Sequence, residues 1–224
     1  MKSTVTLLAA IVLPFYSATS INFDSMKLGQ LPPGWTSTVT NHGDHPPQWM
    51  VEHDPTAPSR PNVLAQFSKG GLHYRFPVCL FDKVTCVDGD VSVKIKIISG
   101  KDNQDAGVVF RAVDQNNYYL VRASAREHNI EMFRVKDGTF EPIRPISVSN
   151  GTSTNSYAVL HPIKIGDWNL LRVTYKGNQA TVYFNHRKVF DARDSQLNSP
   201  GRGGVWTNAD TVAYFDDFRI DKKR

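Results

Sequence analysis

The chain has 224 residues, and its 26 basic and 21 acidic residues give a formal net charge of +5. This length is enough for one domain with a full hydrophobic core. The basic residues are spread along the sequence and no nucleic-acid-binding motif is present, so we expect no nucleic-acid partner.

The first twenty residues have the pattern of a secretory signal peptide. Lys2 supplies the positive charge, Val5 to Phe15 is apolar, and Ala18 and Ser20 are the small residues that precede a cleavage site. We therefore predict a signal peptide at residues 1–20, cleavage after Ser20, and export to the periplasm or the extracellular space. An uncleaved N-terminal anchor is the alternative, although the apolar run is short for a membrane span. No later stretch is apolar enough to cross a membrane.

Strand signals dominate the rest of the chain, and helical periodicity is nearly absent. Short runs rich in Val, Ile, Phe and Tyr are bounded by Gly, Asn and Asp, which is typical of β-strands. In chain order, the predicted strands are Gln48–His53, Val63–Phe67, Val78–Phe81, Val91–Ile98, Gly107–Val113, Tyr118–Ser124, Ile130–Val135, Trp168–Tyr175, Ala180–Asn185, Lys188–Asp191, Gly203–Thr207 and Thr211–Ile220.

Turn residues connect several of these strands. Asp137-Gly138 and Gly177-Asn178 supply the positive φ that tight hairpins need, and Asn185-His186 predicts a third turn without the usual glycine. A long connection is expected between Pro142 and Pro162. Many short antiparallel strands in one domain predict an all-β sandwich of two sheets, covering residues 21–224 and most simply a monomer.

The two cysteines, Cys79 and Cys86, leave two alternatives open. An exported chain meets an oxidising compartment, and a small hairpin between the two residues would allow a disulfide. Buried free thiols are the other possibility. A zinc site is not favoured, because no further Cys or His stands at a suitable spacing.

Three arginines, Arg111, Arg122 and Arg134, lie in strand-like runs among apolar and aromatic residues. A buried cation without a partner is costly, so these arginines either pair with acids or line a groove that holds a ligand. Internal pairs would join Arg111 to Asp114 or Asp210, and Arg122 to Glu131.

A ligand groove is the interpretation we favour. The three arginines could lie side by side across neighbouring strands, and Arg122 shares a face with Tyr118 and Leu120. Guanidinium groups suit carboxylates and vicinal hydroxyls, and aromatic faces suit the apolar faces of sugar rings. The candidate ligand-binding residues are Arg111, Asn117, Tyr118, Arg122, Asn129, Arg134, Trp206, Thr207, Asn208 and Asp210.

Several segments resemble a known group of secreted bacterial domains. The segments are NFDSMKLGQLPPGW, DPTAPSRPNVLAQ, SGKDNQDAGVVFRAVDQNNYYLVRASAREHNIEMFRVKDG, GDWNLLRVTYKGNQATVYFNHRKVFDARD and GGVWTNADTVAYFDDFRI. They resemble concanavalin A-like, laminin G-like jelly rolls, close to the 3-keto-disaccharide hydrolase domains. The resemblance implies a jelly-roll sandwich, a fold that hosts lectins, hydrolases, lyases and inert modules.

The resemblance also allows catalytic and metal sites to be sought. Retaining glucanases of this fold carry E-x-D-x-x-E on one strand, and the nearest match here, Glu52 to Ala57, lacks the final acid. The hydrolase domains show a Glu-Val-Gln-like strand where this chain has Tyr118 to Arg122. A structural calcium, common in such jelly rolls, would use Asp24 and Asp216; alternatively, Asp216 caps backbone amides or pairs with an arginine.

These observations predict an exported module that binds a saccharide on its concave sheet. The first alternative is a glycoside hydrolase that acts on 3-keto-glycosides or a related sugar, with Asp210 or Glu131 as the general base. The second is a structural or adhesion module that binds another protein, which a large exposed apolar patch would favour.

Overall fold

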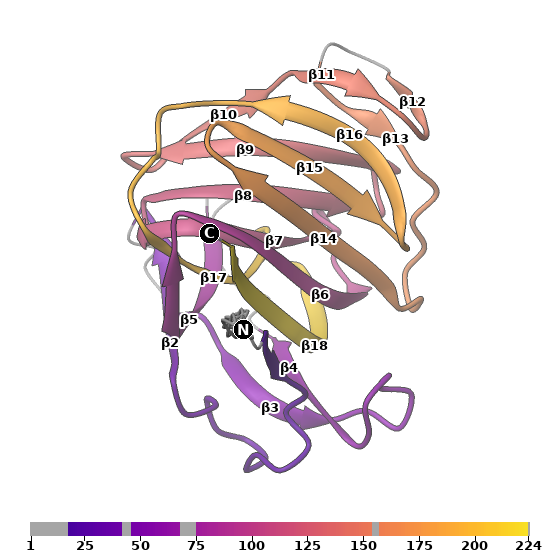
Figure 1. The fold of residues 1–224 in the computed structure, drawn as a ribbon. Helices are drawn as coiled ribbons and strands as arrows, with labels where there is room; N and C mark the ends of the chain where they lie inside the picture. The colour runs from indigo at the N-terminus through magenta and orange to yellow at the C-terminus, as the bar shows by residue number, and fades with distance from the viewer. Residues whose placement is uncertain (1–17, 42–45, 68–74, 154–156, 224) are drawn as a thin grey trace, which may run out of the picture.

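The computed structural model describes residues 18–41, 46–67, 75–153 and 157–223. In these ranges the chain forms two antiparallel sheets, each with nine strands, packed face to face (Figure 1). The described residues include no helix with the length and apolar character that a membrane crossing requires. The predicted all-β sandwich is confirmed.

The first sheet, called the β18 sheet after its long C-terminal strand, contains the first and last described strands. Its strands, in spatial order, are β11 (Pro145–Val148), β16 (Arg187–Arg193), β15 (Gln179–Phe184), β14 (Asn169–Lys176), β6 (Asp88–Ser99), β18 (Val212–Lys223), β4 (Asn62–Gln66) and β3 (Trp49–His53), and β1 (Thr19–Ile21) also pairs with β18.

The second sheet, called the β8 sheet, contains the arginine-bearing strands. Its strands, in spatial order, are β12 (Thr152–Ser153), β13 (Val159–Leu160), β9 (Asn129–Lys136), β8 (Asn117–Ser124), β7 (Asp105–Asp114), β17 (Gly201–Thr207), β5 (Phe76–Cys86) and β2 (Trp35–Thr40), and β10 (Thr139–Ile143) also pairs with β9.

The main core fills the space between the two sheets, because alternate residues of each strand point inward. Trp35 contributes a large ring from β2, with centroid distances of 5.2 Å to Phe81 and 4.9 Å to Phe218. These rings join strands from both sheets. Burial of this apolar surface is the main stabilising term of such a sandwich.

The outward face of the β8 sheet is concave. Phe140 of β10 and Phe76 of β5 lie with ring centroids 4.2 Å apart, although β9, β8, β7 and β17 separate their strands in the sheet. In a flat sheet, five strand spacings would place them about 24 Å apart. The sheet therefore curls around its outward face, which we call the concave face.

All twelve predicted strands are present, with ends shifted by a few residues. The structure adds β1, β2 and β10 to β13, so the stretch from Pro142 to Pro162, expected to be one long connection, contains short strands. Asn185 and His186 both have positive φ, at 46° and 67°, which shows that this hairpin is tight without a glycine.

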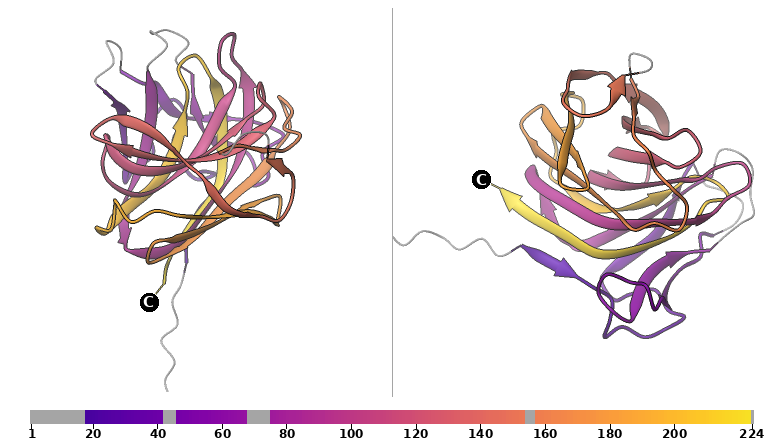
Figure 2. Two further views of the ribbon diagram at one scale, coloured as in Figure 1. Left: turned by 90° about the horizontal axis from the view of Figure 1, so that it is seen from above. Right: turned by 90° about the vertical axis from the view of Figure 1, so that its right-hand side faces the viewer.

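The N-terminal prediction falls mostly outside the described residues, which begin at 18. Thr19, Ser20 and Ile21 are described, and they pair with Phe218 to Ile220 of β18 (Figure 2). Cleavage after Ser20 would remove two of the three residues of β1. The signal peptide and the cleavage point stay predictions.

Candidate functional site

The two faces of β8 differ in what they contact. Tyr119, Val121 and Ala123 belong to the core between the sheets, whereas Tyr118 and Leu120 belong to a second apolar cluster on the concave face. Arg122 follows this second set by alternation, as the sequence predicts. It is the residue at which the apolar part of the concave face becomes polar.

Aromatic and aliphatic side chains form the floor of the concave face. The buried members are Val78, Leu80, Val109, Ala112, Tyr118, Leu120, Val135 and Trp206, and the half-buried rings of Phe76, Phe133 and Phe140 pack against them. The Phe133 ring also lies 5.4 Å from the guanidinium carbon of Arg122. Partly exposed rings therefore adjoin a cation on this face.

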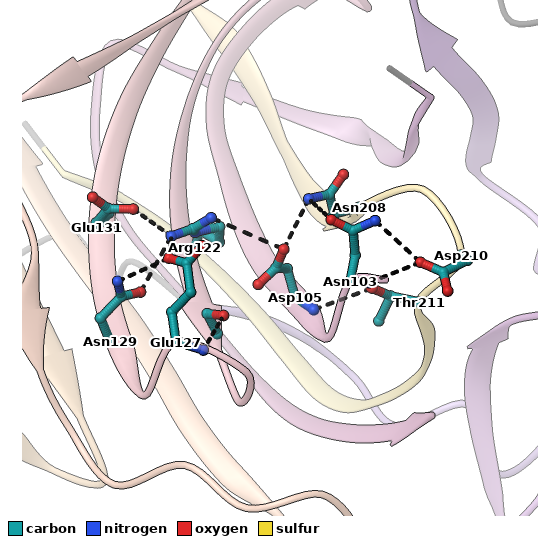
Figure 3. A network of polar contacts seen from close by, with 10 residues as sticks. Asn103, Asp105, Arg122, Glu127, Asn129, Glu131, Asn208, Asp210 and Thr211 are labelled. Carbon is teal, nitrogen blue, oxygen red and sulfur yellow. Dashed lines mark hydrogen bonds and ion pairs between the residues drawn. The ribbon is translucent and has the colours of Figure 1, made fainter. Parts of the chain in front are cut away.

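Arg122 is surrounded by acids from three elements (Figure 3). Its Nη2 donates to Glu127 at 2.6 Å, to Asn129 at 3.2 Å and to Glu131, the residue directly opposite on β9. Its Nη1 lies 3.9 Å from Asp105 Oδ2 of β7. One guanidinium therefore faces three carboxylates.

A chain of hydrogen bonds extends this network to the end of β17. The Asn208 amide donates to Asp105 at 2.8 Å and to the Asn103 side-chain oxygen at 2.9 Å, and the Asn103 amide donates to Asp210 at 3.1 Å (Figure 3). Asp210 also accepts the backbone amides of residues 101–103. The loop before β7 is thereby fixed against the loop after β17.

Charge and burial act in opposite directions on these groups. Burial raises the pKa of Glu131, and the neighbouring carboxylates Glu127 and Asp105 add to the rise against the effect of Arg122. Burial also opposes ionisation of Glu127, but the charge of Arg122 and hydrogen bonds from Asn129 and Arg122 lower its pKa overall. The three carboxylates raise the pKa of Arg122 although its burial opposes this.

Some buried polar atoms of this network have no hydrogen-bond partner among the described residues. They are Asp105 Oδ1, Arg122 Nε and Asn208 Oδ1. A buried polar group without a partner is costly, and such groups are uncommon in folded proteins. Their concentration around Arg122 distinguishes this part of the concave face.

The expectation that the three arginines lie side by side is wrong. Arg134 pairs in register with Tyr119, so its side chain leaves β9 on the face opposite to Arg122, where it bonds to Asp194 and Glu141. The register between strands decides this, and residue types alone do not reveal it.

Arg111 is also removed from the concave face. It has a φ of 50° where the pairing of β7 with β8 is irregular. Its guanidinium donates to the carbonyls of Val87 at 2.6 Å and Gly177 at 2.7 Å, and to Asp88 at 3.2 Å. The suggested partners Asp114 and Asp210 are therefore wrong for Arg111, whereas the suggested pair of Arg122 and Glu131 is present.

The other candidate residues separate into two groups. Asn129 and Trp206 lie at the concave face with Arg122. The Tyr118 hydroxyl lies 2.8 Å from the Thr40 hydroxyl and is fully buried, and Thr207 is also fully buried. Asn117 bonds to Asp114 within a turn. These contacts give Tyr118 and Asn117 structural roles, whereas the buried Thr207 hydroxyl has no hydrogen-bond partner among the described residues.

Asp210 is poorly suited to act as a general base. Burial opposes its ionisation, but three backbone amides and the Asn103 side chain lower its pKa overall. These donors occupy the carboxylate. Glu131, the other catalytic candidate, is held in the ion pair with Arg122.

Asn208 is among the residues that the sequence selects, whereas Asp105 and Glu127 are not. Asp105 begins β7, Glu127 lies in a turn and Asn208 follows β17, so their convergence depends on the pairing of β17, β7, β8 and β9. Alternation places Asp105 on the same face as Gly107, and the pairing of Gly107 with Arg122 then brings Asp105 to the arginine.

The two calcium candidates, Asp24 and Asp216, both accept hydrogen bonds from the segment of residues 59–62. The Asp216 carboxylate accepts Ser59 N at 2.8 Å, Ser59 Oγ at 2.7 Å and Asp217 N at 2.7 Å, which is the backbone-capping alternative. Asp24 accepts the Asn62 amide of the same segment at 3.2 Å. No cluster of three or more His, Cys, Asp or Glu residues suited to a metal occurs in the described ranges. Calcium at Asp24 and Asp216 stays a prediction.

The cysteines are free and buried. Both belong to β5, which runs without a hairpin from Phe76 to Cys86, so the hairpin that a disulfide would need is absent. Cys86 Sγ instead lies 3.0 Å from the Tyr175 hydroxyl. The free-thiol alternative is the one that the structure contains.

Comparison with known proteins identifies the fold. No protein-family model matches the sequence, and no significant match is found among curated proteins, so the kinship with 3-keto-disaccharide hydrolase domains is not confirmed. Carbohydrate-binding module CBM66 from Bacillus subtilis is 20% identical with a TM-score of 0.63, over 84% of this chain and 95% of that one. The fold is a concanavalin A-like jelly roll.

Two further solved structures support the same fold. The cellulose-induced protein Cip1 is 15% identical with a TM-score of 0.58, over 90% of this chain and 96% of that one. The exoplasmic domain of VIP36, bound to Ca²⁺ and Man3GlcNAc, is 11% identical with a TM-score of 0.53, over 86% of each chain. At these identities, the similarity establishes the architecture of this chain and no activity.

Proposed function

We propose that this protein binds a saccharide on the concave face of the β8 sheet, at the network around Arg122. The observation that carries the proposal is the juxtaposition of the half-buried Phe133 ring with Arg122 and its acidic partners. Sugar rings have apolar faces that pack on aromatic rings, and their hydroxyls bond to carboxylate, amide and guanidinium groups.

The fold is compatible with this function. CBM66 is by its name a carbohydrate-binding module, and the VIP36 domain was solved with a bound oligosaccharide. Because one fold serves many functions, these similarities support the proposal only as analogy. The local chemistry of the concave face is the stronger argument.

The proposal is tested by isothermal titration calorimetry against a panel of oligosaccharides, with wild-type protein, Phe133→Ala and Tyr183→Ala. Tyr183 is the matched control, because its ring is also half-buried and stacks on an arginine, Arg172, but on the other sheet. We expect Phe133→Ala to weaken binding at least tenfold, about 1.4 kcal/mol, and Tyr183→Ala to leave it unchanged. Equal affinities for all three proteins would place the ligand elsewhere. Absence of binding to every oligosaccharide of the panel would refute saccharide binding.

Turnover of the saccharide is the second candidate function. The position of Glu131 on the concave face favours it, because a carboxyl group beside a bound sugar can act as a general acid or base. Mass spectrometry of the same samples, with 3-keto-glucosides included, would detect product. Product that disappears in Glu131→Gln would make the protein a glycoside hydrolase; unchanged glycans would leave it a binding module.

Export and a monomeric state complete the proposal. Export is supported by the apolar, lysine-led sequence of residues 1–20. Cell fractionation and N-terminal sequencing of the mature chain test it, and light scattering tests the monomer. A chain that stays in the cytoplasm with Met1 intact would refute export.

A further inference from the structure

The charges around Arg122 do not balance. Asp105, Glu127 and Glu131 all act electrostatically on its guanidinium. Arg126 also acts on Glu127, whose side chain is 53% exposed at the rim. In the described part of the chain, Arg122 is the one basic residue that forms an ion pair with these three acids.

The hydrogen-bonding capacity is unbalanced in the same sense. An ionised carboxylate accepts about four hydrogen bonds and donates none. Glu131 receives its hydrogen bond from Arg122, and Glu127 receives two, from Arg122 and Asn129. Asp105 accepts from Asn208 through Oδ2, and its Oδ1 has no partner in the described part of the chain. The site has more acceptors than donors.

The Nη2 group of Arg122 is already engaged, whereas its Nε has no partner in the described part of the chain and its Nη1 lies 3.9 Å from Asp105. The Nη2 group alone contacts Glu127, Asn129 and Glu131. A ligand carboxylate or sulfate at Nε or Nη1 would lie beside three carboxylates of like charge, and one that displaced Glu131 would leave this acid buried without its cation. Breaking a buried ion pair in this way is strongly unfavourable.

We infer that the concave site selects sugars that offer hydrogen-bond donors, hydroxyl or ammonium groups, and rejects sugars that carry a carboxylate or a sulfate. Neutral and amino sugars therefore form its ligand class, and uronic acids and sulfated sugars do not. This inference rests on the proposed function and specifies its ligand chemistry. Arg122 then serves to hold the three carboxylates in place rather than to bind an acidic sugar.

The test compares oligosaccharides of four classes at pH 7: neutral glucose, arabinose and mannose oligomers, glucosamine oligomers, oligogalacturonates, and sulfated galactose oligomers. Calorimetry should show the neutral or glucosamine oligomers binding at least tenfold more tightly than any anionic oligomer. Tightest binding of an oligogalacturonate or a sulfated oligomer overturns the inference and leaves saccharide binding intact. Absence of binding in every class refutes the proposed function, and the inference with it.

A charge variant tests the same inference by changing the protein and keeping one pair of sugars. Glu127→Gln removes one negative charge at the exposed rim, where folding is least at risk, and Glu52→Gln on β3 is the matched control on the other sheet. The ratio of affinities for galacturonate over neutral oligomers should rise at least threefold in Glu127→Gln and stay constant in Glu52→Gln. An unchanged ratio in Glu127→Gln overturns the inference.

Discussion

Arg122 of β8 and Glu131 of β9 are direct cross-strand partners, and their side chains form an ion pair on the concave face. Both side chains are nearly buried, with 12% and 11% exposed. Removal of the guanidinium leaves three carboxylates without their shared cation. The pair is therefore expected to matter for folding as well as for binding.

We predict that Arg122→Met lowers the free energy of unfolding by roughly 3–5 kcal/mol, because it breaks a buried ion pair. The double variant Arg122→Met/Glu131→Leu should recover part of this loss, since it also removes the buried Glu131 carboxylate that would otherwise lack its cation. Arg219→Met is the control, because Arg219 is 55% exposed and lies 4.0 Å from Asp221. Urea unfolding measures all three, and equal midpoints for Arg122→Met and wild type would show that the pair adds no stability.

Gly107 should not tolerate a side chain. It pairs with Arg122 and Trp206, and an added Cβ would lie 2.6 Å from both the Val121 carbonyl oxygen and Leu120 Cδ1. Because the carbonyl belongs to the neighbouring strand, Gly107→Ala should cost about 1–3 kcal/mol and weaken saccharide binding. Gly166→Ala has open space and a φ of 85°, so it tests backbone strain alone and should leave binding intact. Intact binding in Gly107→Ala would contradict the close packing beside Arg122.

Asp216 should make stability fall with rising pH. Burial raises its pKa from 3.8 to about 6 in spite of the hydrogen bonds from Ser59 and Asp217. Between pH 4 and pH 6 the folded state therefore holds a proton that the unfolded state has lost, and this contribution to stability disappears as the pH rises through the folded pKa. The shift corresponds to roughly 3 kcal/mol.

Urea unfolding of wild type and Asp216→Asn across pH 4–7, with a chelator present, measures this contribution. The stability of the wild type relative to Asp216→Asn should fall as the pH rises through this window. A constant difference would show that Asp216 has an ordinary pKa.

Calcium bound at Asp24 and Asp216 would offset part of the loss of stability that we expect at higher pH. A bound cation stabilises the folded state by about 2.7 kcal/mol at a concentration one hundred times its dissociation constant. Thermal unfolding should then shift upward with Ca²⁺ in wild type and stay constant in Asp216→Asn. Identical melting curves of the wild type with Ca²⁺ and with chelator would dismiss the calcium site.

Both thiols should be unreactive in the folded protein. Burial, with a smaller contribution from the charge of Asp82, holds the pKa of Cys79 well above its usual value, and burial also raises the pKa of Cys86. A thiol reagent at pH 8 should label no cysteine before denaturation and both afterwards, without any reductant. Failure to label the denatured chain would reveal a disulfide.

The long strands could be predicted from sequence because each one is a run rich in β-branched and aromatic residues, and residues typical of turns separate the runs. The missed strands are short or lie at an edge, and they depend on pairing with a distant partner. Two examples are β13, which consists of Val159 and Leu160 paired with β9, and β10, which packs Phe140 onto the concave face. Local sequence carries little of this information.

The site was predicted in part, for the same reason. Alternation correctly placed Arg122 with Tyr118 and Leu120, but Arg134 projects from the opposite face because of its register with β8. Arg111 leaves the expected pattern because its backbone has a positive φ. The acids around Arg122 come from β7, a turn and β9, so only the assembled sheet brings them together.

The pairing of β1 with β18 has a practical consequence for handling this protein. Thr19 lies opposite Ile220, so the first described strand and the last run side by side on the sheet that does not carry the Arg122 network (Figure 2). A surface linker or a fluorescent fusion attached after β18, which ends at Lys223, would start from this sheet. Immobilised in this way, the protein would present its concave face to the solution.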